Sequence, residues 1–259
     1  PILKWIVGNL KSCGIQEIII VTGYKQDKIH DFFGDNVQYR FNPFYKHCNQ
    51  VGSAWFARND MNDEFVYIHA DVFFDVRILE NLLKRTEDIC IAVEPREDFE
   101  EEDHKVLTAG NHVREVHKET IPHETAFGEF LGMVRFSKKG AGLIKSEIER
   151  IMEIEDNLDK YFSFSINRLI NKGIEVHHCD ISYPWIEIDF PEEMELAEQL
   201  EYPLFSDIEK IKHKVKRGDF LGKIANQYNC KIKDIMLWND LKTDQIKVGQ
   251  RLNIYRTVK

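Results

Sequence analysis

Residues 64–75 read Glu64-Phe-Val-Tyr-Ile-His-Ala-Asp-Val-Phe-Phe-Asp75, and this stretch decides the fold. Its first half is rich in apolar and aromatic residues, which predicts a buried strand over residues 65–70. The apolar run stops at Asp71 and resumes at once over residues 72–74. A carboxylate beside a core is costly unless it is paired, hydrogen-bonded or bound to a metal. We therefore expect a partner against Asp71, the alternative being that Asp71 is a turn or helix-capping residue.

Helical and strand patterns alternate around this stretch. Such alternation predicts an α/β fold, here a Rossmann-like three-layer α/β/α domain with a mainly parallel mixed sheet. Ser53 is expected to cap one helix, and Gly110-Asn111 is expected to form the turn of a hairpin. The predicted helices cover residues 3–10, 26–33, 53–59, 77–85, 141–154 and 161–170, and the strands cover 17–21, 37–41, 65–70, 89–93, 106–109, 113–117, 127–136 and 174–179.

A second carboxylate follows a short alternating strand. Trp185-Ile-Glu-Ile-Asp189 stops at Asp189, just before Pro191. Ligands of parallel α/β sheets bind beyond the carboxyl ends of strands, so Asp71 and Asp189 are predicted to meet in one cleft. Hard oxygen ligands of this kind suit Mg²⁺. The alternative for Asp189 is a helix start, because Asp-x-Pro-Glu-Glu is also a good helix N-terminus.

Composition narrows the class of protein. The 259 residues are 43% hydrophobic and 31% charged, as in a globular protein with an ample core. No apolar run approaches the roughly 18 residues of a membrane span. The chain starts without an initiator Met or a signal-peptide pattern, so we expect it to begin inside a longer polypeptide.

The five cysteines are odd in number and show no C-x-x-C pair. This favours reduced thiols in a cytoplasmic protein over a disulfide or zinc framework. His177, His178 and Cys179 adjoin one another, but neighbours in an extended segment point to opposite faces, so no metal cluster of these three is expected.

Charge divides the chain in two. Residues 211–259 contain 12 Lys and Arg against 4 Asp and Glu, a net charge of +8, whereas residues 1–210 contain 23 against 40, a net charge of −17. Such asymmetry favours separate modules. Pro203 follows a helical pattern and marks a connector. We predict a first domain over residues 1–204, a linker over 205–210 and a second domain over 211–259.

The order of motifs in the first domain resembles the sugar-nucleotidyltransferase family of NTP transferases. The matching pieces cover nearly all of residues 1–200. Within the family, Gly128-Glu-Phe-Leu-Gly-Met133 and the W-x-E-I-D ending look most like bacterial cytidylyltransferases acting on phosphocholine, aminoethylphosphonate or inositol phosphate. The matching pieces are Pro1-Ile-Leu3, Gly14-Ile-Gln-Glu-Ile-Ile-Ile-Val-Thr-Gly-Tyr24, Asn42-Pro43, Gly52-Ser-Ala54, His69-Ala-Asp71, Gly128-Glu-Phe-Leu-Gly132 and Trp185-Ile-Glu-Ile-Asp189.

The resemblance implies a reaction in which a phosphate or phosphonate oxygen attacks the α-phosphorus of an NTP, with CTP favoured, and expels pyrophosphate. By this similarity Asp71 and Asp189 hold Mg²⁺, and Gly52 and Ser53 lie against the nucleotide. Lys118 would neutralise the acceptor phosphate, unless it is a solvated surface lysine.

The resemblance also implies residues for the acceptor. Glu129 and Glu187 would contact it, although Glu129 is also readable as a rim carboxylate with no partner. If the acceptor is choline, Trp185, Tyr183 or Phe190 would offer it a cation–π face, the alternative for each being core packing.

Two departures from the family pattern affect the expected activity. The glycine-rich phosphate loop of the family, with its arginine and a following lysine, would lie before Pro1, so we expect the chain as written to be inactive or nearly so. Tyr161-Phe-Ser-Phe164 stands where phosphocholine enzymes tend to carry acidic residues, which argues against a choline acceptor.

The basic second domain resembles a LysM domain across its length. A LysM domain implies a small βααβ fold, with a core here of Val215, Leu221, Ile224, Ala225, Ile235, Leu252 and Ile254. The resemblance also implies binding of an N-acetylglucosamine-containing glycan such as peptidoglycan. The residues implied in glycan binding are Gly218, Asp219, Phe220, Asn239, Leu241 and Ile246.

Two functions from different classes remain open. The first is an Mg²⁺-dependent nucleotidyltransferase that supplies precursors of surface polymers. The alternative is a non-catalytic glycan-binding protein that acts through its LysM module. The basic module carries no nucleic-acid motif, so no nucleic-acid partner is predicted.

Overall fold

The computed structural model describes residues 2–155, 157–188, 208–228, 230–239, 241 and 243–257. The chain divides into two compact units, and each is described by itself. The larger unit is Val7–Ala70 with Leu79–Ile181, and the other comprises Pro1–Ile6, Asp71–Ile78 and Ser182–Lys259. The predicted metal ligand Asp189, the aromatic Phe190 and residues 205–207 of the predicted linker 205–210 lie outside the described residues. Residues 208–210 of that linker are not a connector, because they open a strand, Ile208–Lys214.

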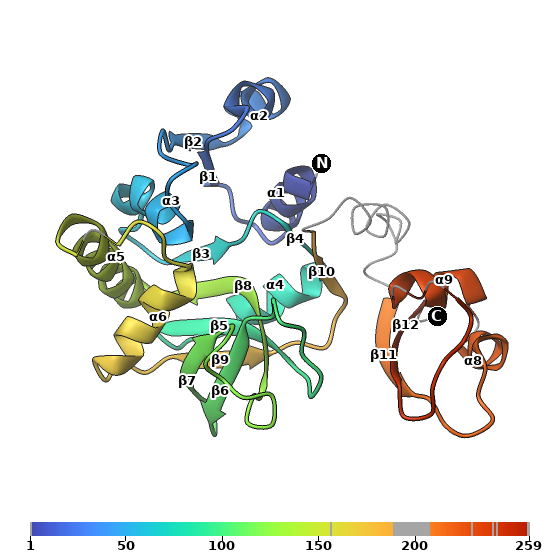
Figure 1. The fold of residues 1–259 in the computed structure, drawn as a ribbon. Coiled ribbons are helices and arrows are strands. Elements are labelled where there is room, and N and C mark those ends of the chain that lie inside the picture. The colour runs from blue at the N-terminus through green and yellow to red at the C-terminus, as the bar shows by residue number, and fades with distance from the viewer. Residues whose placement is uncertain are drawn as a thin grey trace. The chain divides into compact units, whose positions relative to one another are not determined.

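Helices and strands alternate along the chain as the sequence predicts (Figure 1). Most predicted elements are present, with bounds shifted by a few residues. The elements up to β5 are α1 (Ile2–Ser12), β1 (Ile19–Thr22), α2 (Gln26–Phe33), η1 (Gly34–Asn36), β2 (Gln38–Phe41), α3 (Gln50–Phe56), η2 (Arg58–Asp60), β3 (Phe65–Ile68), β4 (Val72–Phe74), α4 (Val76–Leu83) and β5 (Ile89–Pro95). The later elements of the first predicted domain are β6 (Lys105–Ala109), β7 (His112–His117), β8 (Gly128–Phe136), α5 (Lys138–Glu153), α6 (Phe162–Asn171), β9 (His177–Asp180) and β10 (Trp185–Glu187).

A six-stranded mixed sheet of order β3-β8-β5-β9-β7-β6 forms the centre of the larger unit. The α/β class and the mixed sheet are confirmed, but the expectation of mainly parallel pairing is wrong for the described strands. Only β5–β9 in this sheet and β1–β2 beside it pair in parallel. β3, β5 and β9 do point the same way, but β8 inserts between β3 and β5 and runs antiparallel to both. The β6–β7 hairpin adds further antiparallel pairs.

At its central strand β5 (Ile89–Pro95), this sheet is buried on both faces. On one face, α3, α5 and α6 cover a core of aliphatic and aromatic side chains, which includes Ile91 of β5, Val134 of β8 and Ile148 of α5. On the opposite face of β5, Cys90 and Ala92 are also fully buried. A sheet covered on both sides is the arrangement expected of an α/β domain.

Two local predictions need correction. Ser53 does not cap a helix, because it lies inside α3, whose N-cap is Asn49, with its side chain accepting a hydrogen bond from the Gln50 backbone N–H. Residues 72–74 are more than an apolar continuation of β3. They form the separate strand β4, which pairs antiparallel with β10.

The β4–β10 pair lies in the smaller unit and packs against the start of α1. Trp5 stacks on Phe73 with ring centroids 4.8 Å apart and donates its indole N–H to the Phe74 carbonyl at 2.7 Å. Both strands bury their apolar side chains, since Val72 and Phe74 are fully buried and Trp185 is 7% exposed. The pair is thereby held in one register, Val72 opposite Glu187.

The C-terminal module has the predicted βααβ order: β11 (Ile208–Lys214), α8 (Leu221–Tyr228), α9 (Ile232–Trp238) and β12 (Arg251–Thr257). β11 and β12 pair antiparallel along their whole lengths. The seven residues predicted as its core are the seven that form its buried cluster. Roughly 45 residues therefore close a core of their own.

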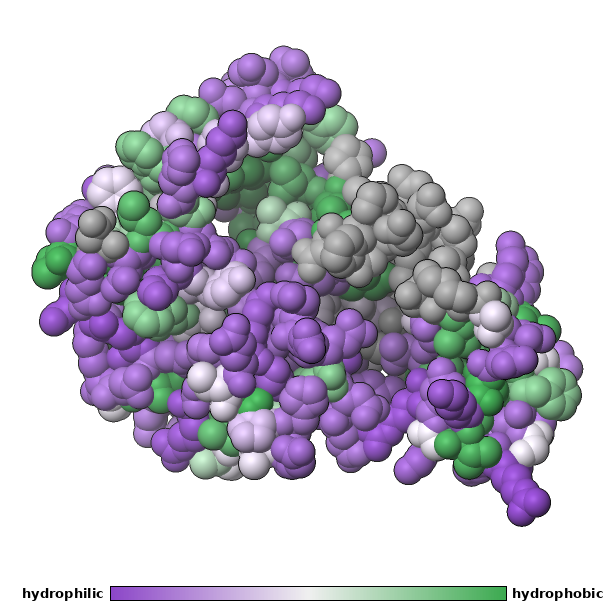
Figure 2. All heavy atoms as spheres, viewed as in Figure 1, coloured by the Kyte–Doolittle hydropathy of each residue, from purple (hydrophilic) through white to green (hydrophobic). Residues whose placement is uncertain are grey.

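On the face shown in Figure 2 hydrophilic residues predominate, which fits the 31% charged residues of the sequence. None of the helices in the described part of the chain has the length and apolar character that a bilayer crossing needs.

Candidate functional site

The sequence predicts that a second carboxylate, that of Asp189, lies near Asp71. Within the described residues, the carboxylate near Asp71 is that of Glu187. The Ile188 N–H donates to the Asp71 carbonyl at 2.9 Å, which extends the β4–β10 pairing by one residue. The carboxylate oxygens of Asp71 and Glu187 lie within 4.8 Å of one another. By its resemblance to the family, the sequence predicts Glu187 as an acceptor-binding residue and Asp189 as a metal ligand. Asp189 remains a prediction.

The surroundings of Asp71 disfavour an uncompensated negative charge on its carboxylate. Its Oδ1 is buried and has no hydrogen-bond partner among the described residues. Burial raises the pKa of Asp71, while its own backbone N–H opposes that rise. Asp71 lies in a turn, as one part of its alternative expects. The helix-capping part is wrong, because Asp75 accepts the Arg77 N–H at the start of α4. A buried orphan oxygen beside a second carboxylate fits Mg²⁺, which prefers hard oxygen donors.

His69 lies two residues before Asp71, in the matching piece His69-Ala-Asp71, and the sequence predicts no role for it. Its Nε2 is buried without a hydrogen-bond partner in the described residues. Burial, helped by the Lys118 charge, lowers the pKa of His69 to about 4, so the ring is neutral at pH 7. Gly132 makes room for it, since a Cβ there would lie 2.3 Å from His69 Nδ1. The signal in the sequence was a histidine at the end of a buried strand.

Lys118 is more than a solvated surface lysine, because its side chain is only 21% exposed. Its ammonium pairs with Glu102 at 3.0 Å and lies 5.1 Å from the centroid of the Tyr161 ring. It also lowers the pKa of His69, and, after burial, that of His104 to about 3. Lys118 therefore places a positive charge beside two neutral histidines of the larger unit.

Glu129 is neither exposed nor without a partner, which corrects the rim-carboxylate alternative. Its side chain is 6% exposed and forms an ion pair with Arg96. Burial raises the pKa of Glu129 to about 8, against the lowering effect of Arg96. Asp103 and Glu94 add to the rise. An acceptor that binds this carboxylate would compete with Arg96 for it.

Gly52 and Ser53 lie in α3, where close contacts already surround them. A Cβ at Gly52 would lie 2.6 Å from the Cys48 Cβ, so the absent side chain gives room to Cys48. The Ser53 hydroxyl accepts a hydrogen bond from the Asn42 amide at 3.2 Å. Their assignment to the nucleotide remains a prediction.

Of the aromatic residues proposed for a choline acceptor, Trp185 and Tyr183 are described, and both already make contacts. Trp185 is buried in β10, as its packing alternative expects. Tyr183 carries the Arg77 guanidinium 4.2 Å above its ring. Neither ring, as placed here, presents an open face to a quaternary ammonium group.

In the LysM module, the predicted glycan residues differ in exposure. Phe220 is 62% exposed and is free to stack on a sugar ring. Gly218 adopts a φ of +89°, which only glycine takes readily, and it forms the turn before α8. The Asp219 carboxylate holds that turn by accepting the Lys216 N–H and the Lys223 ammonium, each at 2.8 Å, which lowers its pKa.

The remaining predicted glycan residues stabilise the module. Asn239 bridges α9 and β12, because its amide donates to the Ile235 and Asn253 carbonyls, each at 2.8 Å. Leu241 and Ile246 pack against the buried cluster. An open pocket of about 490 Å³ shares Asp219 with the predicted glycan residues and has a mainly basic lining, which consists of Lys212, His213, Lys214, Lys216, Asp219, Lys223, Gln227 and Tyr228.

Comparison with solved structures defines the class of fold. The chain superposes on the CTP:phosphocholine cytidylyltransferase of Streptococcus pneumoniae with a TM-score of 0.64, 23% identity, and coverage of 78% of this chain and 86% of that one. The inositol-1-phosphate CTP transferase of T. maritima gives a TM-score of 0.62 and 18% identity, over 76% of this chain and 80% of that one. The first predicted domain therefore has the α/β fold of the nucleotidyltransferases.

Sequence comparison gives the relatives. The CTP:phosphoglutamine cytidylyltransferase of Campylobacter jejuni subsp. jejuni serotype O:2 is 22% identical over 225 residues, which cover 75% of this chain and 86% of the relative. Residues 213–254 match the LysM domain family. The homologues and structural neighbours of this chain are thus nucleotidyltransferases, and a LysM domain lies near its C-terminus, as its motifs predict.

Proposed function

We propose that the chain is an Mg²⁺-dependent nucleotidyltransferase. It would transfer a nucleoside monophosphate, with CMP favoured, from an NTP to a small phosphorylated alcohol, phosphonate or sugar, and release pyrophosphate. The observation that carries the proposal is the buried, unpartnered Asp71 Oδ1 next to the Glu187 carboxylate. The printed activities of the relatives support cytidylyl transfer in particular. Supply of surface-polymer precursors and a cytoplasmic location belong to the same proposal.

The residues divide the work by charge. Asp71 and Glu187 would hold Mg²⁺, with Asp189 proposed as a further ligand. Mg²⁺ bound there supplies neutralisation of the phosphate oxygens, which phosphoryl-type transfers need more than covalent chemistry. Lys118 would neutralise the acceptor phosphate. His69 is neutral at pH 7, so its ring would orient a phosphate oxygen by hydrogen bonding without adding charge.

The decisive assay measures pyrophosphate release with Mg²⁺ and each of the four NTPs over a panel of phosphorylated alcohols, phosphonates and sugar phosphates. Asp71→Asn should abolish turnover, and Lys118→Met should raise KM for the acceptor. Lys138→Met is the matched control, because Lys138 is 74% exposed and pairs only with exposed Asp63. Full activity of Asp71→Asn would remove the carboxylate from the mechanism.

We further propose that the LysM module binds an N-acetylglucosamine-containing glycan. The match over residues 213–254 supports this, as does the exposure of Phe220. The four lysines of the pocket provide a second route, attraction to anionic polymer, which is screened by salt.

Retention of the protein on purified peptidoglycan separates these two routes. Glycan recognition predicts retention at high salt on wall stripped of anionic polymer, with a loss in Phe220→Ala. Retention that disappears with salt and survives Phe220→Ala would contradict glycan recognition and leave only charge.

A further inference from the structure

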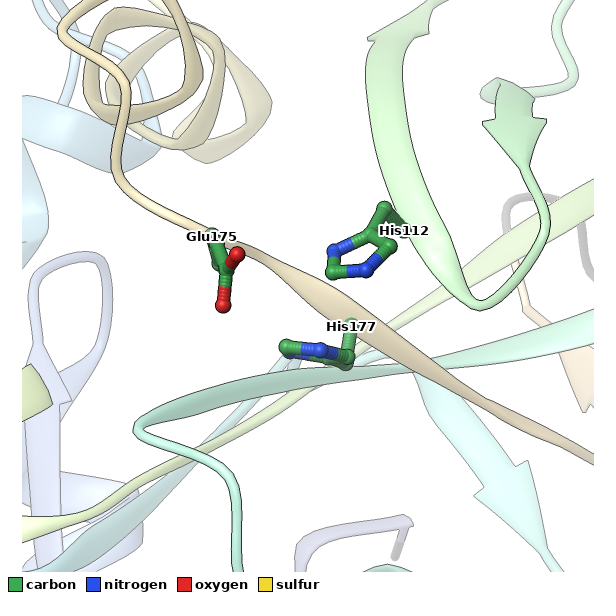
Figure 3. A group of neighbouring side chains, drawn as sticks. All are labelled: His112, Glu175 and His177. Carbon is green, nitrogen blue, oxygen red and sulfur yellow. The ribbon is translucent and has the colours of Figure 1, made fainter.

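A cluster of metal-ligating side chains lies in the larger unit, on residues that the proposed nucleotidyl transfer does not use. His112, Glu175 and His177 each offer a ligand atom, and these atoms all lie within 4.8 Å of one another. Figure 3 shows the three side chains gathered beside the segment that enters β9. None of the three belongs to the predicted site.

The sheet register explains why they meet. His112 opens β7 and stands opposite His177, the first residue of β9, and their ring centroids are 4.6 Å apart. Glu175 is two residues before His177, so alternation along an extended chain puts both on one face. Val113 and Val176, the neighbours in sequence, are buried in the core under the other face.

One atom of the cluster lacks the partner that its burial demands. His177 Nδ1 is buried and has no hydrogen-bond partner within the described residues. The adjacent His178 is different, because its Nδ1 lies 2.6 Å from Asp180 and its Nε2 lies 3.2 Å from the Gly110 carbonyl. A buried imidazole nitrogen left unpaired costs free energy unless something binds it.

We propose that His112, Glu175 and His177 form a binding site for a divalent transition metal ion, with Zn²⁺ as the ion best suited. Two imidazoles and one carboxylate are a donor set that zinc accepts, with a fourth position open to water. Mg²⁺ and Ca²⁺ prefer oxygen donors throughout. Tetrahedral zinc with bonds of about 2.0–2.1 Å holds its ligands about 3.3 Å apart. Rotation of the exposed Glu175 side chain and small ring movements would close the present separations.

Within the central sheet, the bound ion would link the first residue of β7 to the first residue of β9. The pairing of β7 with β9 comprises the single His112–His177 register position, next to the Val113 N–H that donates to the Val176 carbonyl at 2.8 Å. The β6–β7 hairpin leads into Lys118. A metal ion bound at His112, next to the turn of the hairpin, would therefore stabilise the strand that leads to Lys118, a residue of the proposed active site.

The test is Zn²⁺ binding to the purified chain, measured by competition with a chromogenic chelator in excess Mg²⁺. The wild type should bind Zn²⁺, and His112→Ala, His177→Ala and Glu175→Gln should each bind at least tenfold more weakly, because each loses a ligand. His47→Ala is the matched control, since His47 is exposed, and it should bind like the wild type. Co²⁺ should give visible d–d bands in the wild type that His112→Ala lacks.

A structural readout accompanies the affinity. Zn²⁺ should slow amide hydrogen exchange across residues 105–117 in the wild type but not in His112→Ala. Circular dichroism checks that each variant folds. If His177→Ala does not fold, the Zn²⁺ affinities of the two single variants His112→Ala and Glu175→Gln test the proposal. Wild-type Zn²⁺ affinity in folded His112→Ala and Glu175→Gln, or no Zn²⁺ binding by the wild type, would overturn the proposal.

Discussion

The Glu129–Arg96 pair offers the sharpest test of the electrostatics, through the substitution Arg96→Met. The Glu129 side chain is 6% exposed and that of Arg96 is 23% exposed, so their contact is largely withdrawn from water. Arg96 also lies 3.5 Å from Asp103. Methionine keeps most of the aliphatic volume of arginine, so the substitution chiefly removes the charge and its hydrogen bonds.

The magnitude follows from the cost of a buried charge without its partner, about 3–5 kcal/mol. Burial raises the pKa of Glu129 from 4.5 to about 8, and loss of Arg96 raises it further. A carboxyl with a raised folded pKa contributes no penalty below pH 4.5, where both states are protonated. Stability is then lost as the pH rises, because only the unfolded state can ionise freely. Because the wild-type carboxyl ionises only near pH 8, the missing charge of Arg96 is felt chiefly above that pH. We expect Arg96→Met to lower the free energy of unfolding by about 1 kcal/mol at pH 5 and by about 3 kcal/mol at pH 10.

Urea unfolding followed by circular dichroism at pH 5 and pH 10 measures both values. Adding Glu129→Gln to Arg96→Met should restore most of the loss at pH 10, because the amide needs no counter-charge. Lys138→Met breaks an ion pair whose side chains are 74% and 71% exposed, and it should change stability by under about 0.5 kcal/mol. An equal loss at both pH values in Arg96→Met would refute the reasoning, since it would point to packing alone.

Three further predictions concern activity, backbone strain and glycan binding. Asp71→Asn should lose turnover yet be at least as stable as the wild type at pH 7 by urea unfolding, because burial raises the pKa of that carboxyl and so makes its ionised form unfavourable. Gly132→Ala should destabilise by about 2 kcal/mol or more in thermal unfolding, since φ is +72° and the new Cβ would lie 2.3 Å from His69 Nδ1. Gly142→Ala, with nothing within 4 Å, should be neutral or stabilising. Phe220→Ala should lose retention on peptidoglycan with an unchanged melting temperature, because the ring is 62% exposed.

Local sequence patterns predict individual helices and strands well where apolar spacing and a terminal glycine mark them. The apolar positions of α1, ended near Gly14 at φ +85°, follow from periodicity. The seven core residues of the LysM module were predicted through its resemblance to that domain, and they form its buried cluster. The pairing of strands does not follow from periodicity. Whether β8 runs between β3 and β5 depends on which long-range pairing buries most apolar surface, and no local spacing carries that information. The domain boundary predicted at residues 204–211 stays a prediction.

The candidate site shows the same division. A carboxylate at the end of a buried strand was enough to single out Asp71. Glu187 was assigned to the acceptor by the family resemblance, because no local spacing shows that it meets Asp71; the β4–β10 register, with Val72 opposite Glu187, brings it there. Asp71 lies in a turn before β4, where alternation does not apply, and so the two carboxylates approach one another. Burial of Glu129 was likewise invisible, because its partner Arg96 is 33 residues away.

The histidine cluster shows what alternation can and cannot decide. The rule correctly separates His177 from His178, whose ring nitrogens contact Asp180 and Gly110. By the same rule Glu175 and His177 share a face, a consequence that the sequence alone already contains. The third ligand is different in kind, because His112 reaches them only through the register of β7 against β9. Two ligands at i and i+2 in a strand therefore become informative once a histidine in a neighbouring hairpin is found opposite them.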